Sequence, residues 1–198
     1  MELRSLLDQT FQIESECLEN GSSYIDEAQF ARAVEALRSS QRIAACGCGH
    51  SGILCQHFAH LMCCIEKPAR FIAPGEAVHG GMGYLQSGDV MVFASRGGNT
   101  QELFPIMEIC KARNVITITI TENVQSPLAC KSDIVLRQYV TRETDRDNFQ
   151  GTTSSTVLCV IFHALQAAII EATDFQVRHF AQIHPGGAVG AKLNGRNL

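Results

Sequence analysis

The sequence predicts an α/β protein, a three-layer α/β/α sandwich in which a five-stranded parallel sheet lies between two layers of helices. Two observations predict this fold. From residue 41 onward, short apolar strands alternate with helical patterns, as expected for a parallel sheet covered on both faces. Glycine-rich turns also lead from strands into helices. The 198 residues, 45% of them hydrophobic, are enough for one core, so a single domain over 1–198 is expected.

The first forty residues carry two amphipathic helical patterns. Leu3, Leu7 and Phe11 repeat at helical spacing, as do Phe30, Val34 and Leu37, and the segment 20–23 (NGSS) separates the two patterns. Both helices are apolar on one face and precede the first strand. This arrangement predicts self-association.

The remaining residues, 41–198, supply the sandwich and its C-terminal helices. The expected strands are 42–47, 69–73, 89–95, 115–120 and 133–137, and the expected helices are 51–65, 100–114, 126–130, 152–173 and 174–182. A glycine-rich segment, HPGGAVG, and a polar tail follow the last helix. Right-handed crossovers should connect the strands.

Composition and charge exclude several classes of protein. The formal net charge is −4 and Lys and Arg do not cluster with aromatic residues, so nucleic acid is not expected as a partner. We find no signal-peptide pattern and no apolar run near the ~20 residues that span a bilayer. The nine cysteines, among them Cys46, Cys110 and Cys159 in apolar stretches, are expected to be reduced core thiols. Together these features predict a cytoplasmic protein that contacts no membrane.

One segment, HFAHLMCC, raises the possibility of a metal site. His57, His60 and Cys64 could share one helical face. No second ligand loop accompanies them, so we expect neither a metal nor a cofactor.

The turn GCGHSG poses the central question about the ligand. Gly47, Gly49 and Gly52 match G-x-G-x-x-G, yet a helix N-terminus binds any phosphate, whether of a dinucleotide or of a small metabolite. A dinucleotide fold needs a carboxylate about 20 residues further on. Only Glu76 is near that position, which leaves a dinucleotide-dependent reductase as a weak alternative.

Two further hydroxyl-rich turns favour a phosphate monoester. The third strand ends in SRGGNT, where Ser95, Asn99 and Thr100 offer donors, and the long helix opens with TTSST over 152–156. With Ser51, these loops would surround a phosphate with neutral donors. The hydroxyl run also has an ordinary structural explanation, because such residues commonly serve as alternative N-caps of a helix.

At this point the succession GCGHSG, EAVHGG, SRGGNTQEL, RET with TTSST, and HPGGAVG resembles the sugar isomerase (SIS) domain family, in particular its D-arabinose 5-phosphate isomerase branch. The resemblance extends from about Glu14 to the end of the sequence. It implies a flavodoxin-like doubly wound sheet, and a homodimer or homotetramer with sites between subunits. Longer relatives carry two cystathionine-β-synthase modules after this domain, and the sequence stops where they would begin.

The resemblance implies an aldose–ketose isomerase that acts on a sugar phosphate through an enediol or enediolate. The family's catalytic groups would fall on Glu102, Glu143 and His184, with His79 close to the sugar. Its substrate and phosphate contacts would fall on Gly49, His50, Ser51, Ser95, Gly98, Asn99, Thr100, Thr153, Ser154 and Ser155.

Each catalytic candidate also has an ordinary structural explanation. Glu102 is a first-turn carboxylate that the helix dipole favours. Glu143 lies in the charged stretch RETDRD, which is typical of a solvated surface, and His184 could cap the turn before Pro185.

Several positions depart from the family pattern. His50 stands where the family usually has lysine, Gly97 where it has a second serine and Asn99 where it has glutamate; Gly81 and His163 replace aspartates. Histidine is largely neutral at pH 7, so a fixed positive charge is lost at position 50. Two interpretations therefore stay open: an isomerase of altered substrate range, or a sugar-phosphate-binding module with little turnover.

Overall fold

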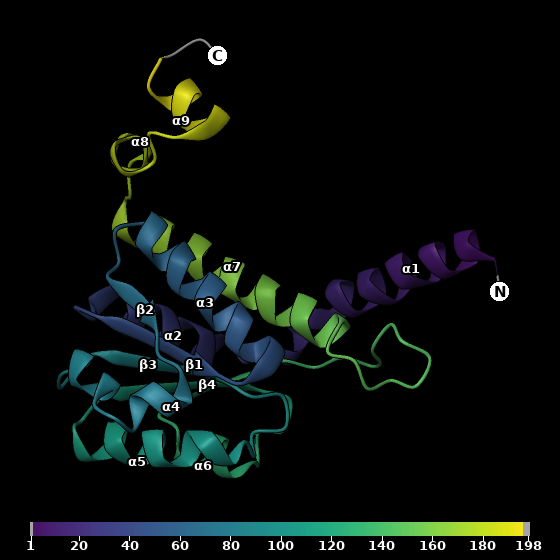
Figure 1. Ribbon diagram of the computed structural model, residues 1–198, viewed down its shortest axis with the longest axis horizontal. Helices are drawn as coiled ribbons and strands as arrows, with labels where there is room; N and C mark the ends of the chain where they lie inside the picture. Colours follow the sequence, from purple (N-terminus) through teal and green to yellow (C-terminus); the bar gives the residue numbers. More distant parts are fainter. Residues whose placement is uncertain (1, 196–198) are drawn as a thin grey trace.

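The computed structural model describes residues 2–195 and confirms the predicted α/β/α sandwich (Figure 1). The parallel strands lie in the order β2-β1-β3-β4-β5, which is the flavodoxin-like order. The strands are β1 (Ile43–Gly47), β2 (Ala69–Phe71), β3 (Val90–Ala94), β4 (Ile116–Thr121) and β5 (Ile134–Arg137). Every residue of β1 and β3 is buried, as expected for central strands that are covered on both faces.

One face of the sheet is covered by α2 (Glu27–Ser39), α3 (Gly49–Cys64) and α7 (Thr153–Thr173). The helix α1 (Leu3–Gly21) packs against α7 on the outside of this layer. The core between α3 and α7 includes a stacked pair of buried rings, Phe58 and Phe162, with centroids 4.5 Å apart. This pair fixes how the two helices face each other.

The opposite face carries α4 (Pro74–Ala77), α5 (Phe104–Ala112) and α6 (Pro127–Lys131), with the 3-10 turns η2 (Gly81–Tyr84) and η3 (Gln101–Leu103). The predicted helix over 100–114 is therefore two elements. Pro105 lies in the first turn of α5, where its fixed φ and missing N–H are tolerated. Glu102 consequently lies in η3 rather than in the α-helix.

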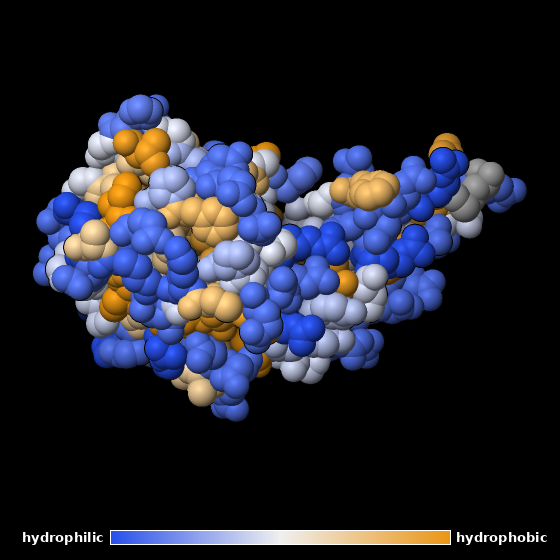
Figure 2. Space-filling model, turned by 90° about the horizontal axis from the view of Figure 1, so that it is seen from below, coloured by the Kyte–Doolittle hydropathy of each residue, from blue (hydrophilic) through white to orange (hydrophobic). Residues whose placement is uncertain are grey.

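The N-terminal helices are confirmed, but α1 is only partly packed. A 3-10 turn, η1 (Ser22–Tyr24), leads from α1 to α2, and the Asp26 carboxylate caps α2 by accepting a hydrogen bond from the backbone N–H of Gln29 (2.9 Å). The first half of α1 projects from the body as an arm (Figures 1 and 2). Its apolar side chains Leu3 and Phe11 are 83% and 68% exposed.

The C-terminal segment lies beyond the far end of α7. It forms α8 (Val177–Ile183), as expected, and a further helix, α9 (Gly187–Leu193), where the sequence predicted only a glycine-rich segment and a tail. Close packing explains this difference. A Cβ on Gly190 would lie 2.4 Å from the carbonyl oxygen of His184, so the glycine permits the tight turn between the helices.

The helix α7 contradicts the expectation that no apolar run is long enough to span a bilayer. Its 21 residues pass that test by length and composition, and among residues 2–195 it alone does so. The same helix buries Val157, Ile161, Phe162 and Leu165 against the sheet and its neighbouring helices. Core helices commonly show this pattern, so the test is weak evidence here.

The parallel register brings the loops after β1, β3 and β4 to one edge of the sheet. Ala94, the last residue of β3, pairs with Gly47 on one side and with Ile120 on the other. Ligands of doubly wound sheets bind at this carboxyl edge. A binding site is therefore expected where these three loops meet.

Candidate active site

The first loop is the turn from β1 into α3 (GCGHSG, 47–52), and close contact between this strand and this helix shapes it. A Cβ on Gly52 would lie 2.7 Å from the Gly47 carbonyl oxygen, and a Cβ on Gly47 would lie 3.0 Å from that of Ala94. Gly49 has φ +55°, which glycine adopts readily. No side chain caps the start of α3 at Cys48, so the first N–H groups of this helix remain available to an anion.

A pocket of about 270 Å³ opens between this loop and the start of α7. It is lined by Cys48, His50, Ser51, Arg96, Gln138, Phe149, Gly151, Ser154, Ser155 and Leu158. Four of the residues predicted to bind phosphate, His50, Ser51, Ser154 and Ser155, therefore lie together. The others do not line this pocket.

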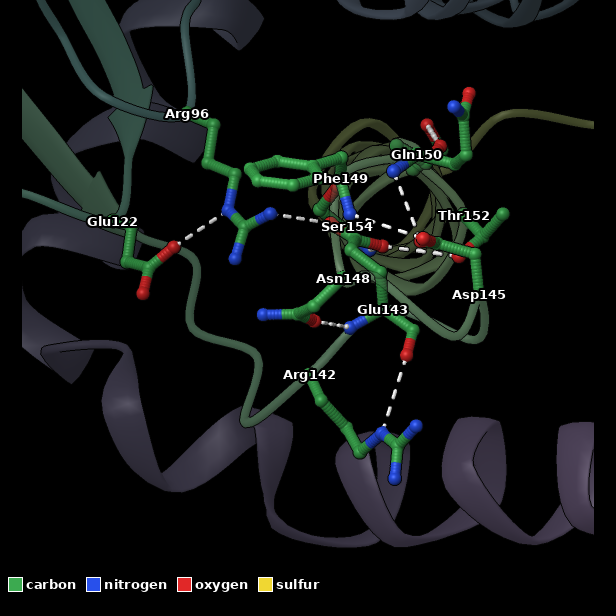
Figure 3. A network of polar contacts seen from close by, with 12 residues as sticks. Arg96, Glu122, Arg142, Glu143, Asp145, Asn148, Phe149, Gln150, Thr152 and Ser154 are labelled. Atoms are coloured by element: carbon green, nitrogen blue, oxygen red, sulfur yellow. Dashed lines mark hydrogen bonds and ion pairs between the residues drawn. The ribbon is translucent and has the colours of Figure 1, made fainter.

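Arg96 lines the pocket but was not among the site residues predicted from the sequence. Its Nε donates to Glu122 Oε2 (2.7 Å) and its Nη1 donates to Glu143 Oε1, so two carboxylates hold the guanidinium at the pocket wall (Figure 3). The pocket thus contains one cation beside the expected hydroxyl donors, and its charge is offset by Glu122 and Glu143. Arg96 is the second residue after β3, inside SRGGNT, and this place at a strand end was the sequence signal that could have identified it.

Glu143 is fully buried, which overturns the interpretation of RETDRD as a solvated surface at this position. Its Oε2 accepts hydrogen bonds from the backbone N–H of Ser154 (3.1 Å) and from Thr152 Oγ1 (3.1 Å), and its Oε1 faces Arg96. The carboxylate thus caps α7 and neutralises Arg96. Both oxygens are engaged, so a ligand in the pocket would have to displace a partner to reach them.

The loop before α7 is ordered by a second carboxylate. Asp145 accepts hydrogen bonds from the backbone N–H groups of Asp147, Phe149 and Gln150, at 3.1, 3.2 and 2.9 Å (Figure 3). These bonds lower the pKa of Asp145, and the bond from Gln150 has the largest effect. The turn holds the Phe149 ring at the pocket, next to Arg96, with 87% of the residue exposed.

The second predicted phosphate loop forms hydrogen bonds within itself. Ser95 Oγ lies 2.8 Å from Thr100 Oγ1 and accepts a hydrogen bond from the backbone N–H of Gly98 (3.1 Å). Gly98 has φ +64°, and a Cβ there would lie 1.9 Å from Ser126 Oγ, so this position requires glycine. Ser95 is buried and Asn99 is exposed; neither faces the pocket.

Glu102 and His79 are exposed on neighbouring segments of the same sheet edge. Burial, and then the Glu102 carboxylate, raise the pKa of the Cys48 thiol, but Glu102 itself does not line the pocket. Its turn, η3, packs against α4, which directly precedes the His79 loop. Thr153, by contrast, is fully buried, and its hydroxyl has no hydrogen-bond partner among residues 2–195.

His184 is a predicted catalytic residue that lies far from the pocket within one chain. It follows α8, beyond the far end of α7, a helix of 21 residues. At 1.5 Å per residue, α7 is about 30 Å long and starts at the pocket. The His184 ring packs on Phe180 (centroids 4.8 Å apart), and its Nδ1 atom is buried without a hydrogen-bond partner in the described chain.

Comparisons with known proteins agree with this fold. A model of the SIS domain matches residues 36–168. The arabinose 5-phosphate isomerase KdsD of Francisella tularensis is 34% identical over 189 residues, which cover 93% of this chain and 58% of the relative. The chain thus spans little more than half the length of this relative.

Solved structures give a similar result. A Listeria monocytogenes protein proposed to be a sugar-phosphate isomerase has a TM-score of 0.89 and 32% identity over 94% of this chain and all of its own. An Escherichia coli CFT073 protein in complex with arabinose 5-phosphate has a TM-score of 0.86 and 27% identity over 93% of this chain and all of its own.

The doubly wound parallel sheet with a polar pocket at its carboxyl edge is the arrangement of α/β proteins that bind ligands at their strand ends. With the match over most of the sheet and its helices, the assignment becomes specific. This chain belongs to the SIS domain family.

Proposed function

We propose that this chain is a phosphosugar aldose–ketose isomerase that acts through an enediol or enediolate, on a pentose 5-phosphate such as arabinose 5-phosphate. One observation carries the proposal: His50, Ser51, Ser154 and Ser155 surround a single pocket of about 270 Å³ in an SIS-family chain. Pockets for drug-sized ligands measure roughly 300–1,000 Å³. This pocket therefore suits a small phosphorylated metabolite better than a dinucleotide.

The reaction assigns a role to each candidate side chain. Isomerisation removes the proton beside the carbonyl and returns one to the neighbouring carbon, so it needs a base, a group that opens the ring, and donors to the developing oxyanion. We assign Glu102 as the base, since its carboxylate is exposed near the first loop. Glu143 and His184 are the other proposed acid–base groups, and His79 would approach the sugar.

A second copy of the chain would complete this site. His184 lies beyond the far end of α7, so within one chain it cannot reach a ligand at the pocket. The exposed apolar side chains of α1 offer a surface for association. We therefore propose a homodimer or homotetramer with sites between subunits.

Light scattering should accordingly report at least a dimer at micromolar concentration. The unpaired apolar face of α1, with Leu3 and Phe11 largely exposed, would be buried on association. A stable monomer at this concentration would exclude the shared site.

A binding module with little turnover is the second candidate function. The observation that favours it is Glu143, whose two oxygens are already bound by Arg96, Thr152 and Ser154. In this alternative the pocket holds a sugar phosphate as a signal and Glu102 abstracts no proton.

One panel of ligands separates these functions. Pentose and hexose phosphates should raise the melting temperature, whereas NAD(H) and NADP(H) should leave it unchanged, and the same sugars in deuterated water should exchange their C2 proton by NMR. Stabilisation without exchange would select the binding module. Stabilisation by a nicotinamide cofactor alone would instead support the alternative function, a dinucleotide-dependent reductase.

All nine cysteines are free, and Cys17, Cys46, Cys55 and Cys110 are buried. Free thiols are typical of a reducing compartment, which supports a proposed cytoplasmic location. Cys48, Cys64 and Cys159 are only partly buried and Cys63 and Cys130 are exposed, so the expectation of core thiols is wrong for these five.

A further inference from the structure

Three metal-ligating side chains meet where α3 packs on α7, away from the sugar pocket. His57 comes from α3, and Cys159 and His163 come from α7. The Nε2 atoms of the two histidines lie 3.4 Å apart, and Cys159 Sγ lies 3.4 Å from His163 Nε2. All three donor atoms fall within 4.8 Å of one another.

The helices hold these side chains in place. Cys159 and His163 are four residues apart, so they share one face of α7. Directly beside them, the buried rings of Phe58 and Phe162 stack and fix the register of the two helices. One turn further on, Gln166 Nε2 donates to the carbonyl oxygen of Leu61 (2.8 Å). The three donors therefore lie on a rigid scaffold.

Two of the three donor–donor distances, and the donor types, match a tetrahedral transition metal. Zinc binds histidine nitrogen at about 2.0–2.1 Å and thiolate sulfur at about 2.3 Å, which places ligand atoms roughly 3.3–3.6 Å apart. One thiolate and two imidazoles suit zinc and its neighbours, whereas Mg²⁺ and Ca²⁺ require oxygen ligands. The partial exposure of the cluster leaves room for a water molecule as the fourth ligand.

We propose that His57, Cys159 and His163 form a Zn²⁺-type binding site that ties α3 to α7, with the fourth position open to water. His57 lies seven positions after His50, about 10 Å along α3, and Cys159 lies four positions after Ser155, about 6 Å along α7, so this site begins about one helical turn beyond the phosphate contacts. Its role is structural, because it links the two helices whose first turns carry the pocket residues.

In HFAHLMCC, His57 contacts His163 on α7, whereas His60 Nε2 lies 3.6 Å from Cys64 Sγ on α3 itself. The three side chains considered together in the sequence therefore do not form one cluster. Zinc binds the neutral imidazole and the thiolate, so the Cys159 thiol would release its proton to solvent as the metal binds.

Titration of metal-free protein with Zn²⁺ and Co²⁺ tests this site without any enzyme assay. One ion per chain should bind, Co²⁺ should show a thiolate-to-metal charge-transfer band, and excess Zn²⁺ should raise the melting temperature. Even changes outside the ligand set cost about 10–100-fold in metal affinity, so Cys159→Ser and His163→Gln should each weaken binding by at least about tenfold.

Two matched variants serve as controls. Cys130→Ser removes an exposed cysteine on α6, and His79→Gln removes the histidine of the proposed sugar site; both should keep wild-type metal affinity. Absence of binding would overturn the proposal, as would binding that survives Cys159→Ser but is lost in His79→Gln or in a His60→Gln/Cys64→Ser double variant. If His57→Gln fails to fold, the metal affinities of Cys159→Ser and His163→Gln still test the proposed site.

Discussion

Replacing Glu102 with glutamine is expected to lower turnover of a sugar phosphate by about 10²–10⁴, the usual contribution of a general base. The amide keeps the shape of the side chain but cannot take the C2 proton. Because Glu102 is exposed on η3, the fold should survive, and ligand affinity should change little because the pocket hydroxyls remain. The rate of C2 proton exchange into deuterated water, followed by NMR, measures the loss.

Glu108→Gln is the matched control for this prediction. Glu108 is also an exposed glutamate on the same side of the sheet, paired with Lys131, but it lies on α5. Its variant should exchange at the wild-type rate, and both variants should melt as the wild type does. Unchanged exchange in Glu102→Gln would remove Glu102 from the mechanism.

Replacing Glu143 with glutamine is expected to lower the free energy of unfolding by about 3 kcal/mol, the lower end for breaking a buried ion pair, since the Arg96 side chain is 38% exposed. The new amide group would also point N–H donors at the N–H of Ser154, the hydroxyl of Thr152 or the guanidinium. Urea unfolding, analysed by linear extrapolation, measures the change.

Glu122→Gln provides the comparison, because Glu122 is the other carboxylate bound to Arg96. Its side chain is 29% exposed, so the loss should stay below about 1 kcal/mol. Equal losses in the two variants would show that burial of Glu143 does not set its contribution. A large loss in Glu143→Gln would also explain why Glu102 gives the cleaner test of catalysis.

The sequence predicted the sheet well because its strands carry a strong local signal. The segments RIAACG and DVMVFAS each contain an unbroken apolar run, and the structure places β1 and β3 over these runs. The elements that were missed depend on contacts that no local pattern records. The segment HPGGAVG reads as a loop because of its glycines, yet α9 starts at Gly187 once Gly190 packs against His184.

The candidate site was predicted only in part, for a similar reason. Ser51, Ser154 and Ser155 were found because each follows a strand end or begins a helix. The pairing of Arg96 with Glu143 joins residues 47 positions apart, and no spacing rule connects them. Ser95 and Thr100 also looked like ligand donors, but they bond to each other. The sequence identifies hydroxyl groups without showing which ones are already occupied.

The two carboxylates around Arg96 have a consequence for how a ligand reaches the pocket. The guanidinium brings one positive charge, but Glu122 and Glu143 together offset it, and the whole chain carries a formal net charge of −4. An approaching phosphate monoester therefore meets little long-range attraction. Encounter would proceed by ordinary diffusion and would depend weakly on ionic strength. Recognition would then begin only at hydrogen-bonding distance, where the hydroxyl groups and the helix N–H groups take effect.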